Sequence, residues 1–173
     1  MNIQLLRDSL NYDPKTGIVT WKLCRASHIG RQVGTLTKKG YLRCMVKGHR
    51  IMLHRLAWIL YYGEEPKSLL DHKNRIRTDN RIENLRLAST FENTRNAKLR
   101  VDNSSGEKGV SWHKHSKKWA CRISVNRKTI YLGNFDTKSA ASETYREASL
   151  KYHGEFSAVA SVRAGLPQRA IDV

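Results

Sequence analysis

Apolar residues recur at helical spacing most clearly over residues 53–62, at positions i, i+3, i+4, i+7 and i+8. This spacing is typical of a helix with one buried face. Gly63 follows directly and Pro66 comes soon after, so the helix is expected to end there. A shorter run of the same kind predicts a helix over residues 2–10.

Strand-like segments around these helices predict two β-hairpins. Residues 18–23 (IVTWKL) follow a turn marked by Pro14 and Gly17. Residues 40–46 and 49–53 flank a Lys-Gly turn, and apolar and polar side chains alternate along them. The first half of the chain is therefore expected to combine short helices with hairpins.

A strand pattern returns after residue 107, where three short strands are predicted with turns near 116–117 and 126–127. The second of these strands has one apolar face and one basic, polar face. Trp112 and Trp119 are interpreted as core of this sheet, whereas alternation places Tyr131 on the polar side.

A final helix is predicted after Asp136 or Thr137, either of which can cap it. Alanines lie along one side of this helix, so it can sit close on the sheet, and Gly154 is expected to end it.

Residues 69–96 combine an apolar lead-in, a charged loop rich in turn residues and another predicted helix. Ser89 and Glu92 form a capping box, in which each side chain bonds a backbone N–H at the start of the helix. The capping box predicts that the helix begins there.

Four polar side chains of this stretch offer related chemistry: Asp71, His72, Asn84 and Asn93. Carboxylate and amide oxygens suit a hard divalent cation. A neutral imidazole beside such an ion can take a proton from water. The same residues also have an ordinary structural explanation, because Asp and Asn favour turns and helix ends without any ligand. Their spacing alone leaves both possibilities open.

Together with LHRLAWILYYGEEP upstream and ENTRN downstream, residues 69–97 resemble the ββα-metal (His-Me finger) motif of HNH nucleases. The form is that of free-standing phage homing endonucleases, in which Asn replaces the last His. The resemblance implies hydrolysis of a DNA phosphodiester by a phage-encoded enzyme. It implies one divalent ion, Mg²⁺ with Mn²⁺ as the alternative.

The resemblance also assigns roles to single residues. It implies Asp71 and Asn93 as metal ligands and His72 as the general base. Asn84 is expected to hydrogen-bond across the loop and to orient His72. His54 and Arg55 are expected to have a structural or phosphate-contacting role.

Residues 108–159 resemble the plant ethylene-response-factor (apetala) DNA-binding domain, through GVSWHKHSKKW, IYLGNFDT and KYHGEF. The resemblance implies a sheet that lays its polar face in the major groove of DNA, which admits strands as well as helices. Plant members use several arginines on the sheet, so their target sequence is not implied here. The candidate DNA contacts are basic, polar or aromatic: Lys108, Ser111, His113, Lys114, Lys117, Arg122, Ser124, Arg127, Thr129 and Tyr131.

Charge also favours a nucleic-acid partner. The 173 residues include 32 Lys and Arg against 15 Asp and Glu, a formal net charge of +17, and such a balance favours a polyanion. No long apolar run predicts a transmembrane helix or a secretory leader, and no segment reads as a basic membrane-surface helix. Neither a membrane nor a small-molecule substrate is expected, and the expected location is the cytoplasm of a bacterial host.

Cysteine usage fits a reducing compartment. Cys24, Cys44 and Cys121 are far apart and form no C-x-x-C pair, so neither structural zinc nor a disulfide framework is expected. All three are predicted to be buried or to lie on strands.

The predicted fold class is α+β with two domains. Residues 1–97 form the nuclease domain, with N-terminal hairpins and the ββα-metal motif at 69–97. Residues 98–107 lose periodicity and gain Asn, Ser and Gly, which indicates a linker. Residues 108–160 form a three-stranded antiparallel sheet packed on one helix, and 161–173 are a tail without a clear pattern.

The expected function is a metal-dependent DNA endonuclease, similar to homing endonucleases, whose C-terminal domain binds double-stranded DNA. A single copy of the site favours a monomer that nicks one strand. One alternative is a DNA-binding transcriptional regulator with an inactive nuclease domain, although all four motif residues are present. A structured-RNA binder is another, because charge does not distinguish the two nucleic acids.

Overall fold

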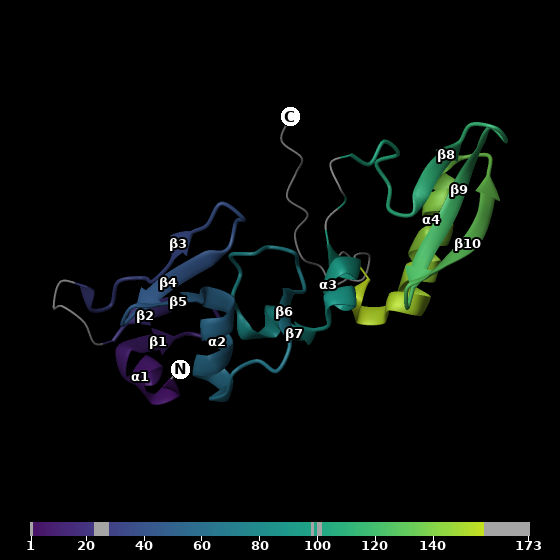
Figure 1. The fold of residues 1–173 in the computed structure, drawn as a ribbon. Coiled ribbons are helices and arrows are strands. Elements are labelled where there is room, and N and C mark those ends of the chain that lie inside the picture. Colours follow the sequence, from purple (N-terminus) through teal and green to yellow (C-terminus); the bar gives the residue numbers. More distant parts are fainter. Residues whose placement is uncertain (1, 23–27, 98, 100–101, 158–173) are drawn as a thin grey trace. The chain divides into compact units, whose positions relative to one another are not determined.

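The computed structural model describes residues 2–22, 28–97, 99 and 102–157, and the chain divides into two compact units (Figure 1). The first unit is Met1–Thr90 and the second is Phe91–Val173. The predicted domain limits, with a linker at 98–107, remain a prediction. The predicted tail at 161–173 and Cys24 lie outside the described residues.

Two helices of the first unit match the apolar spacing of the sequence. Helix α1 (Ile3–Ser9) begins where the Asn2 side chain accepts hydrogen bonds from the backbone N–H groups of Gln4 and Leu5. Helix α2 (Leu53–Tyr62) ends at Gly63, which has a φ of 77°. A left-handed residue at this position is readily supplied by glycine, because glycine has no Cβ to clash.

Within the described residues of the first unit, the strands form three small antiparallel sheets. Both predicted hairpin regions are confirmed as strand pairs, whereas the short strand β3 was not anticipated. The pairs are β1 (Leu10–Tyr12) with β2 (Val19–Trp21), β3 (Thr35–Leu36) with β4 (Leu42–Val46), β4 with β5 (His49–Met52), and β6 (Leu69–His72) with β7 (Leu85–Ala88).

The core of the first unit gathers around α2. Leu53, Leu56 and Ile59 of this helix are at most 1% exposed, and they share a cluster with Leu6 of α1 and Val19 of β2. Full burial of an apolar side chain of this size contributes about 1.5 to 3 kcal/mol to the stability of the folded state. The apolar face of α2 thus holds α1 and the hairpins together.

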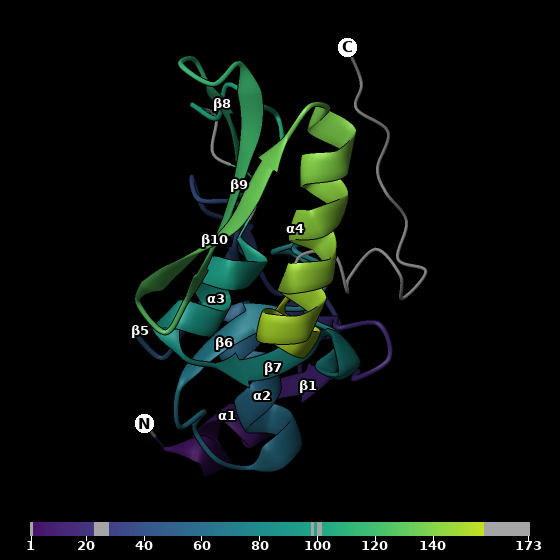
Figure 2. The same cartoon turned by 90° about the vertical axis from the view of Figure 1, so that its right-hand side faces the viewer.

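The second unit begins at Phe91 and contains a sheet with one helix packed along it (Figure 2). The strand order is β10-β9-β8 and all pairs are antiparallel, which confirms the predicted α+β class. Thr137 caps the long helix, since its Oγ1 accepts from the N–H of Ala140 at 3.2 Å. The elements are α3 (Thr90–Asn96), which starts at the boundary, β8 (Val110–His113), β9 (Lys118–Val125), β10 (Lys128–Phe135), α4 (Lys138–His153) and the 3₁₀ turn η3 (Gly154–Phe156).

Aromatic residues of this sheet only partly follow the prediction. Trp119 packs against the core of Val110, Cys121 and Ala141. The placement of Trp112 in the core is wrong, because its side chain is 47% exposed and contacts the Trp119 ring at a centroid distance of 5.1 Å. Trp112 lies on β8, an edge strand of the sheet, so a neighbouring strand flanks it on one side alone.

The burial of Cys44 on β4 and Cys121 on β9 is confirmed. Burial raises the pKa of the Cys44 thiol to about 11, so this thiol stays protonated and unreactive at neutral pH. In the described part of the chain, no helix is long and apolar enough to cross a membrane.

Candidate active site and DNA-binding surface

Asp71 and His72 are the last two residues of β6, and both are buried, at 6% and 4% exposure. Strand β7 pairs with β6 so that Asp71 faces Arg86 and His72 faces Leu85. The Asp71 Oδ2 atom accepts hydrogen bonds from Arg86 Nε at 2.9 Å and Nη2 at 2.8 Å. Arg86 therefore neutralises the buried carboxylate and fixes its orientation.

Two other ring side chains, those of His54 and Tyr41, lie beside the His72 imidazole. Its centroid lies 5.3 Å from that of His54, edge to face, and 6.0 Å from that of Tyr41. Burial lowers the pKa of His72, although its bond with Asn80 and the charge of Asp71 act in the opposite direction. His72 is thus neutral at physiological pH, the state that a general base requires.

His54 was expected to have a structural or phosphate-contacting role, and it lies at the start of α2 against His72. Burial, followed by the neighbouring His72 and Arg55, lowers the pKa of His54 to about 4. Within the described residues, its buried Nδ1 atom has no hydrogen-bond partner. Arg55 lies 3.6 Å from Glu65 in a surface ion pair. The roles of His54 and Arg55 toward phosphate stay predictions.

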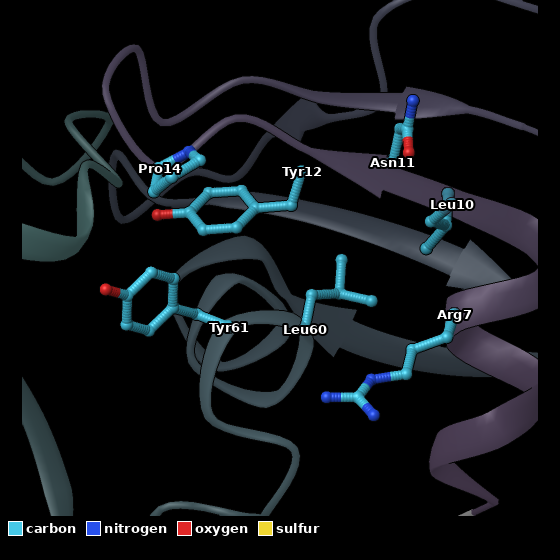
Figure 3. Close-up of a pocket in the computed structure, with 7 residues that line it drawn as sticks. All are labelled: Arg7, Leu10, Asn11, Tyr12, Pro14, Leu60 and Tyr61. Atoms are coloured by element: carbon cyan, nitrogen blue, oxygen red, sulfur yellow. The ribbon is translucent and has the colours of Figure 1, made fainter.

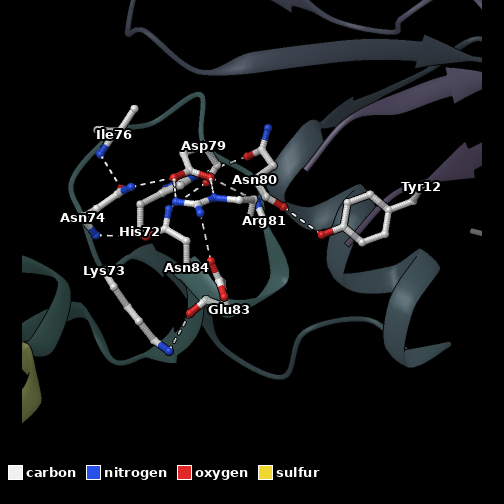
Figure 4. Close-up of polar contacts among 10 residues, drawn as sticks. All are labelled: Tyr12, His72, Lys73, Asn74, Ile76, Asp79, Asn80, Arg81, Glu83 and Asn84. Carbon is white, nitrogen blue, oxygen red and sulfur yellow. Dashed lines mark hydrogen bonds and ion pairs between the residues drawn. The ribbon is translucent and has the colours of Figure 1, made fainter. Parts of the chain in front are cut away.

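The loop between β6 and β7 contains η2 (Ile82–Asn84) and is held by Asn84 (Figure 4). The Asn84 Oδ1 atom accepts from the backbone N–H of Asn74 at 3.0 Å, and its Nδ2 donates to the Asp79 carbonyl at 2.8 Å. Asn84 thus bridges both arms of the loop through backbone atoms. Its role in orienting His72 remains a prediction.

Asn80 and Tyr41 also lie near His72, and neither was predicted as a site residue. The Asn80 Oδ1 atom lies 3.3 Å from His72 Nε2. Asn is so common in turns that no sequence signal distinguishes Asn80 from its neighbours. Tyr41 lies before β4, far from the motif in sequence, so only the fold brings it to His72.

The proposed metal ligands have suitable donor chemistry. Asp71 supplies carboxylate oxygens and Asn93 an amide carbonyl, which are donors that hard divalent ions prefer. Asn93 is half-buried on α3 and belongs to the second unit, so its function as a ligand stays a prediction. Among the residues that the structure describes, no group of three or more His, Cys, Asp or Glu side chains is arranged to hold a metal.

The first unit also contains a pocket, which is lined by residues other than Asp71, His72 and Asn84 (Figure 3). Arg7, Tyr12 and Tyr61 are among its lining residues, and they come from α1, β1 and α2. It contains none of the predicted catalytic or DNA-contacting side chains.

The second unit presents a polar sheet face. In an antiparallel sheet, directly paired residues lie on the same face, and Arg122 pairs with Tyr131 while Ser124 pairs with Thr129. These four residues are exposed. The Arg122 guanidinium lies 5.9 Å from the centroid of the Tyr131 ring. Ser111 and His113 of β8 lie on the same face, because they pair with Ala120 and Lys118.

The remaining DNA-contact candidates lie outside the strands. Lys114 and Lys117 are exposed in the turn between β8 and β9. The Lys108 ammonium donates to the backbone carbonyls of Arg95 and Ala97. The Arg127 guanidinium lies over the Phe91 ring, with its central carbon 5.0 Å from the ring centroid. Lys108 and Arg127 therefore already hold internal contacts of the second unit, and their part in DNA binding stays a prediction.

The sequence profile of the HNH endonuclease family matches residues 52–95. Protein 3.8 of Escherichia phage T7 is 31% identical over 104 residues, which cover 60% of this chain and 85% of the phage protein. The chain belongs to the HNH endonuclease family.

This HNH endonuclease also carries an AP2 domain, whose profile matches residues 105–155. APETALA2-like protein 2 of Oryza sativa subsp. indica is 37% identical over 51 residues, 30% of this chain and 12% of the plant protein. A solved structure titled "DNA binding and cleavage by the HNH homing endonuclease I-HmuI" has a TM-score of 0.41 and 21% identity, covering 83% of this chain and 84% of that one. The matches to the HNH endonuclease and AP2 profiles make the protein a DNA nuclease with a DNA-binding domain.

Proposed function

We propose that this HNH endonuclease hydrolyses one phosphodiester of double-stranded DNA with the help of a divalent ion, nicking a single strand. The observation that carries the proposal is the buried, neutral His72 directly after the arginine-held carboxylate of Asp71. A neutral base directly beside a carboxylate that can hold a divalent ion suits metal-assisted hydrolysis.

His72 has the role of general base in the proposed mechanism. It takes a proton from a water molecule, and the water oxygen forms a bond to phosphorus while the bond from phosphorus to the 3′ oxygen breaks. The 3′ oxygen leaves with a proton from solvent as a hydroxyl, and the new oxygen remains on the 5′-phosphate. Burial favours this role because it keeps the ring neutral until the proton is transferred.

Asp71 and Asn93 would hold the ion, which is Mg²⁺, with Mn²⁺ as the alternative. When bound, a divalent ion neutralises developing charge on the phosphate and on the leaving oxygen. Arg86 keeps the Asp71 carboxylate in one orientation. Asn84 ties the two arms of the β6–β7 loop together.

The AP2 domain binds the duplex target in this proposal, through the exposed face that carries Arg122, Ser124, Thr129 and Tyr131. The protein acts as a monomer in the cytoplasm of a bacterial host. The phage relative supports this setting, and the net charge of +17 supports a polyanionic substrate.

Supercoiled plasmid tests the proposal directly. The wild type should convert it to the open-circular form with Mg²⁺, and a chelator should stop the reaction. His72→Ala should cut at least about a hundredfold more slowly, the scale of losing a general base, with DNA affinity almost unchanged. His28→Ala removes an exposed histidine of the same unit and serves as the control. Equal cutting by wild type and His72→Ala would remove His72 from the mechanism.

A further inference from the structure

Asn80 is unusually buried for an asparagine in a turn. Its side chain is 2% exposed, although it belongs to the charged loop between β6 and β7. The described contact of its amide is the one between Oδ1 and His72 Nε2, at 3.3 Å. The Nδ2 atom is buried and has no hydrogen-bond partner among the described residues. Burying an amide that is only partly satisfied costs stability, so the loop does not place Asn80 there for its own hydrogen bonds.

The N-terminal hairpin holds the backbone at Asn80. The Tyr12 hydroxyl donates to the Asn80 carbonyl at 2.8 Å, as Figure 4 shows. Gly17 approaches so closely that an added Cβ would lie 2.6 Å from the Asn80 carbonyl carbon and 2.5 Å from the Arg81 nitrogen. The Ile82 N–H donates to the Pro14 carbonyl at 3.2 Å. The β1–β2 hairpin is therefore packed against the Asn80–Arg81 peptide, although strands β3, β4 and β5 separate this hairpin from β6 in the sequence.

The neighbours of Asn80 are fixed as well. The Asp79 carboxylate accepts from Arg81 Nε at 2.9 Å and Nη2 at 2.7 Å, and from Asn74 Nδ2 at 2.6 Å. Because the backbone is held on both sides of Asn80, its side chain can move only by changing its rotamer. Its Oδ1 atom is thereby kept at one edge of the His72 ring.

We infer that Asn80 is the positioning residue that selects the tautomer and orientation of His72, and that the β1–β2 hairpin holds Asn80 in place. The inference rests on the proposed role of His72 as base. A carbonyl oxygen can only accept, so the contact requires the proton on Nε2. In the neutral ring, Nδ1 then carries the lone pair, and Nδ1 is the atom that takes the proton from water.

Nuclear magnetic resonance of the full-length protein with ¹⁵N-labelled histidine tests the tautomer without any cleavage assay. His72 should show the Nε2–H form, assigned by the loss of its signals in His72→Gln. Asn80→Ala should convert these signals to those of a tautomer mixture. A wild-type ring protonated on Nδ1, or an unchanged spectrum in Asn80→Ala, would overturn the inference.

Kinetics of plasmid nicking give the second test. Asn80→Ala should lower kcat about 10- to 100-fold, the usual effect of removing a partner that orients a catalytic group, with KM for DNA unchanged. Asn80→Asp keeps an acceptor for Nε2–H and should recover part of kcat, and Tyr12→Phe should cause a smaller loss than Asn80→Ala. Asn11→Ala removes an exposed asparagine on β1 and is the matched control.

The possible outcomes separate the two proposals. Wild-type protein that cuts no DNA would refute the proposed function, whereas the tautomer measurement would still decide the contact between Asn80 and His72. A wild-type kcat in Asn80→Ala would refute the positioning role. Thermal melting of each variant shows whether it still folds. If Asn80→Ala does not fold, Tyr12→Phe is the variant to test. A wild-type spectrum and a wild-type kcat in Tyr12→Phe would refute the inference that the β1–β2 hairpin holds Asn80 in place.

Discussion

Arg86 donates two hydrogen bonds to a single carboxylate oxygen of Asp71, from Nε at 2.9 Å and from Nη2 at 2.8 Å. The two residues are direct cross-strand neighbours in the β6–β7 pair, and their side chains are 9% and 7% exposed. A buried carboxylate is tolerated only when its charge is matched and its oxygens are bonded. Arg86 thus makes it possible for the Asp71 carboxylate to lie inside the first unit.

Replacing Arg86 by Met should therefore strongly destabilise the protein. Asp71 would remain buried without its partner, and breaking such a pair costs about 3 to 5 kcal/mol of unfolding free energy. Urea unfolding measures this change. Arg55→Met is the matched control, because its pair with Glu65 is largely exposed and contributes at most about 1 kcal/mol. Similar losses of unfolding free energy in both variants would show that the buried Asp71–Arg86 pair stabilises the protein no more than a surface ion pair does.

His54 makes stability depend on pH. Its pKa is about 4 in the folded protein against an ordinary value of 6.5. Between these values the unfolded chain binds a proton that the folded unit does not, so the free energy of unfolding falls as pH drops through this window. The stabilising contribution is fully present above about pH 6.5. His72, whose pKa is also lowered, acts in the same direction.

His54→Phe retains a ring and removes the titrating group. Urea unfolding from about pH 7 to about pH 4 should show a shallower loss of stability in this variant than in the wild type. His115→Phe, at an exposed position in the second unit, is the control for the replacement of a histidine by phenylalanine. An identical slope in His54→Phe and the wild type would place the titration elsewhere.

Regular periodicity predicted the elements of this fold well. The apolar spacing over 53–62 and the glycine after it match α2, because a helix face and its end are both local properties. Alternation also assigned the faces of β9, where Cys121 and Ile123 are buried and Arg122 is exposed. The same rule misplaced Trp112, since alternation gives the face of a residue and not whether its strand lies at the edge of the sheet, as β8 does.

The candidate site could be predicted only in part. Asp71 and His72 are adjacent in sequence, so one motif finds both. The environment of His72 is built from Tyr41, His54 and Asn80, which lie far apart in sequence or in an irregular loop. Hydrogen bonds such as that from Tyr12 to the Asn80 carbonyl leave no periodic signal, because they depend on how separate hairpins pack.

Arg122 should contribute to DNA affinity from the exposed sheet face. Its guanidinium lies near the Tyr131 ring, which limits its orientation. If it reads a base edge, Arg122→Ala should weaken binding to the preferred site by about 1 to 3 kcal/mol and relax specificity there. Fluorescence anisotropy on matched duplexes measures both effects.

Arg146→Ala is the control for charge, because Arg146 is an exposed arginine on α4 and pairs with Glu143. It should change affinity much less than Arg122→Ala. A loss of equal size on every duplex would make Arg122 a phosphate contact, and no loss at low salt would remove the sheet face from the DNA interface.

The last prediction is that one protein molecule cuts one strand. The chain contains a single Asp71, His72, Asn84 and Asn93 set, and one base can align one water with one phosphate. Cutting both strands would need two such sites, and hence a symmetric dimer on a target with mirrored half-sites. At limiting enzyme, supercoiled plasmid should convert to the open-circular form, with linear product appearing only late from independent nicks. Sequencing should place the breaks on one strand of the preferred site. Linear DNA formed directly, at a rate that rises with the square of protein concentration, would instead identify a dimer as the active unit.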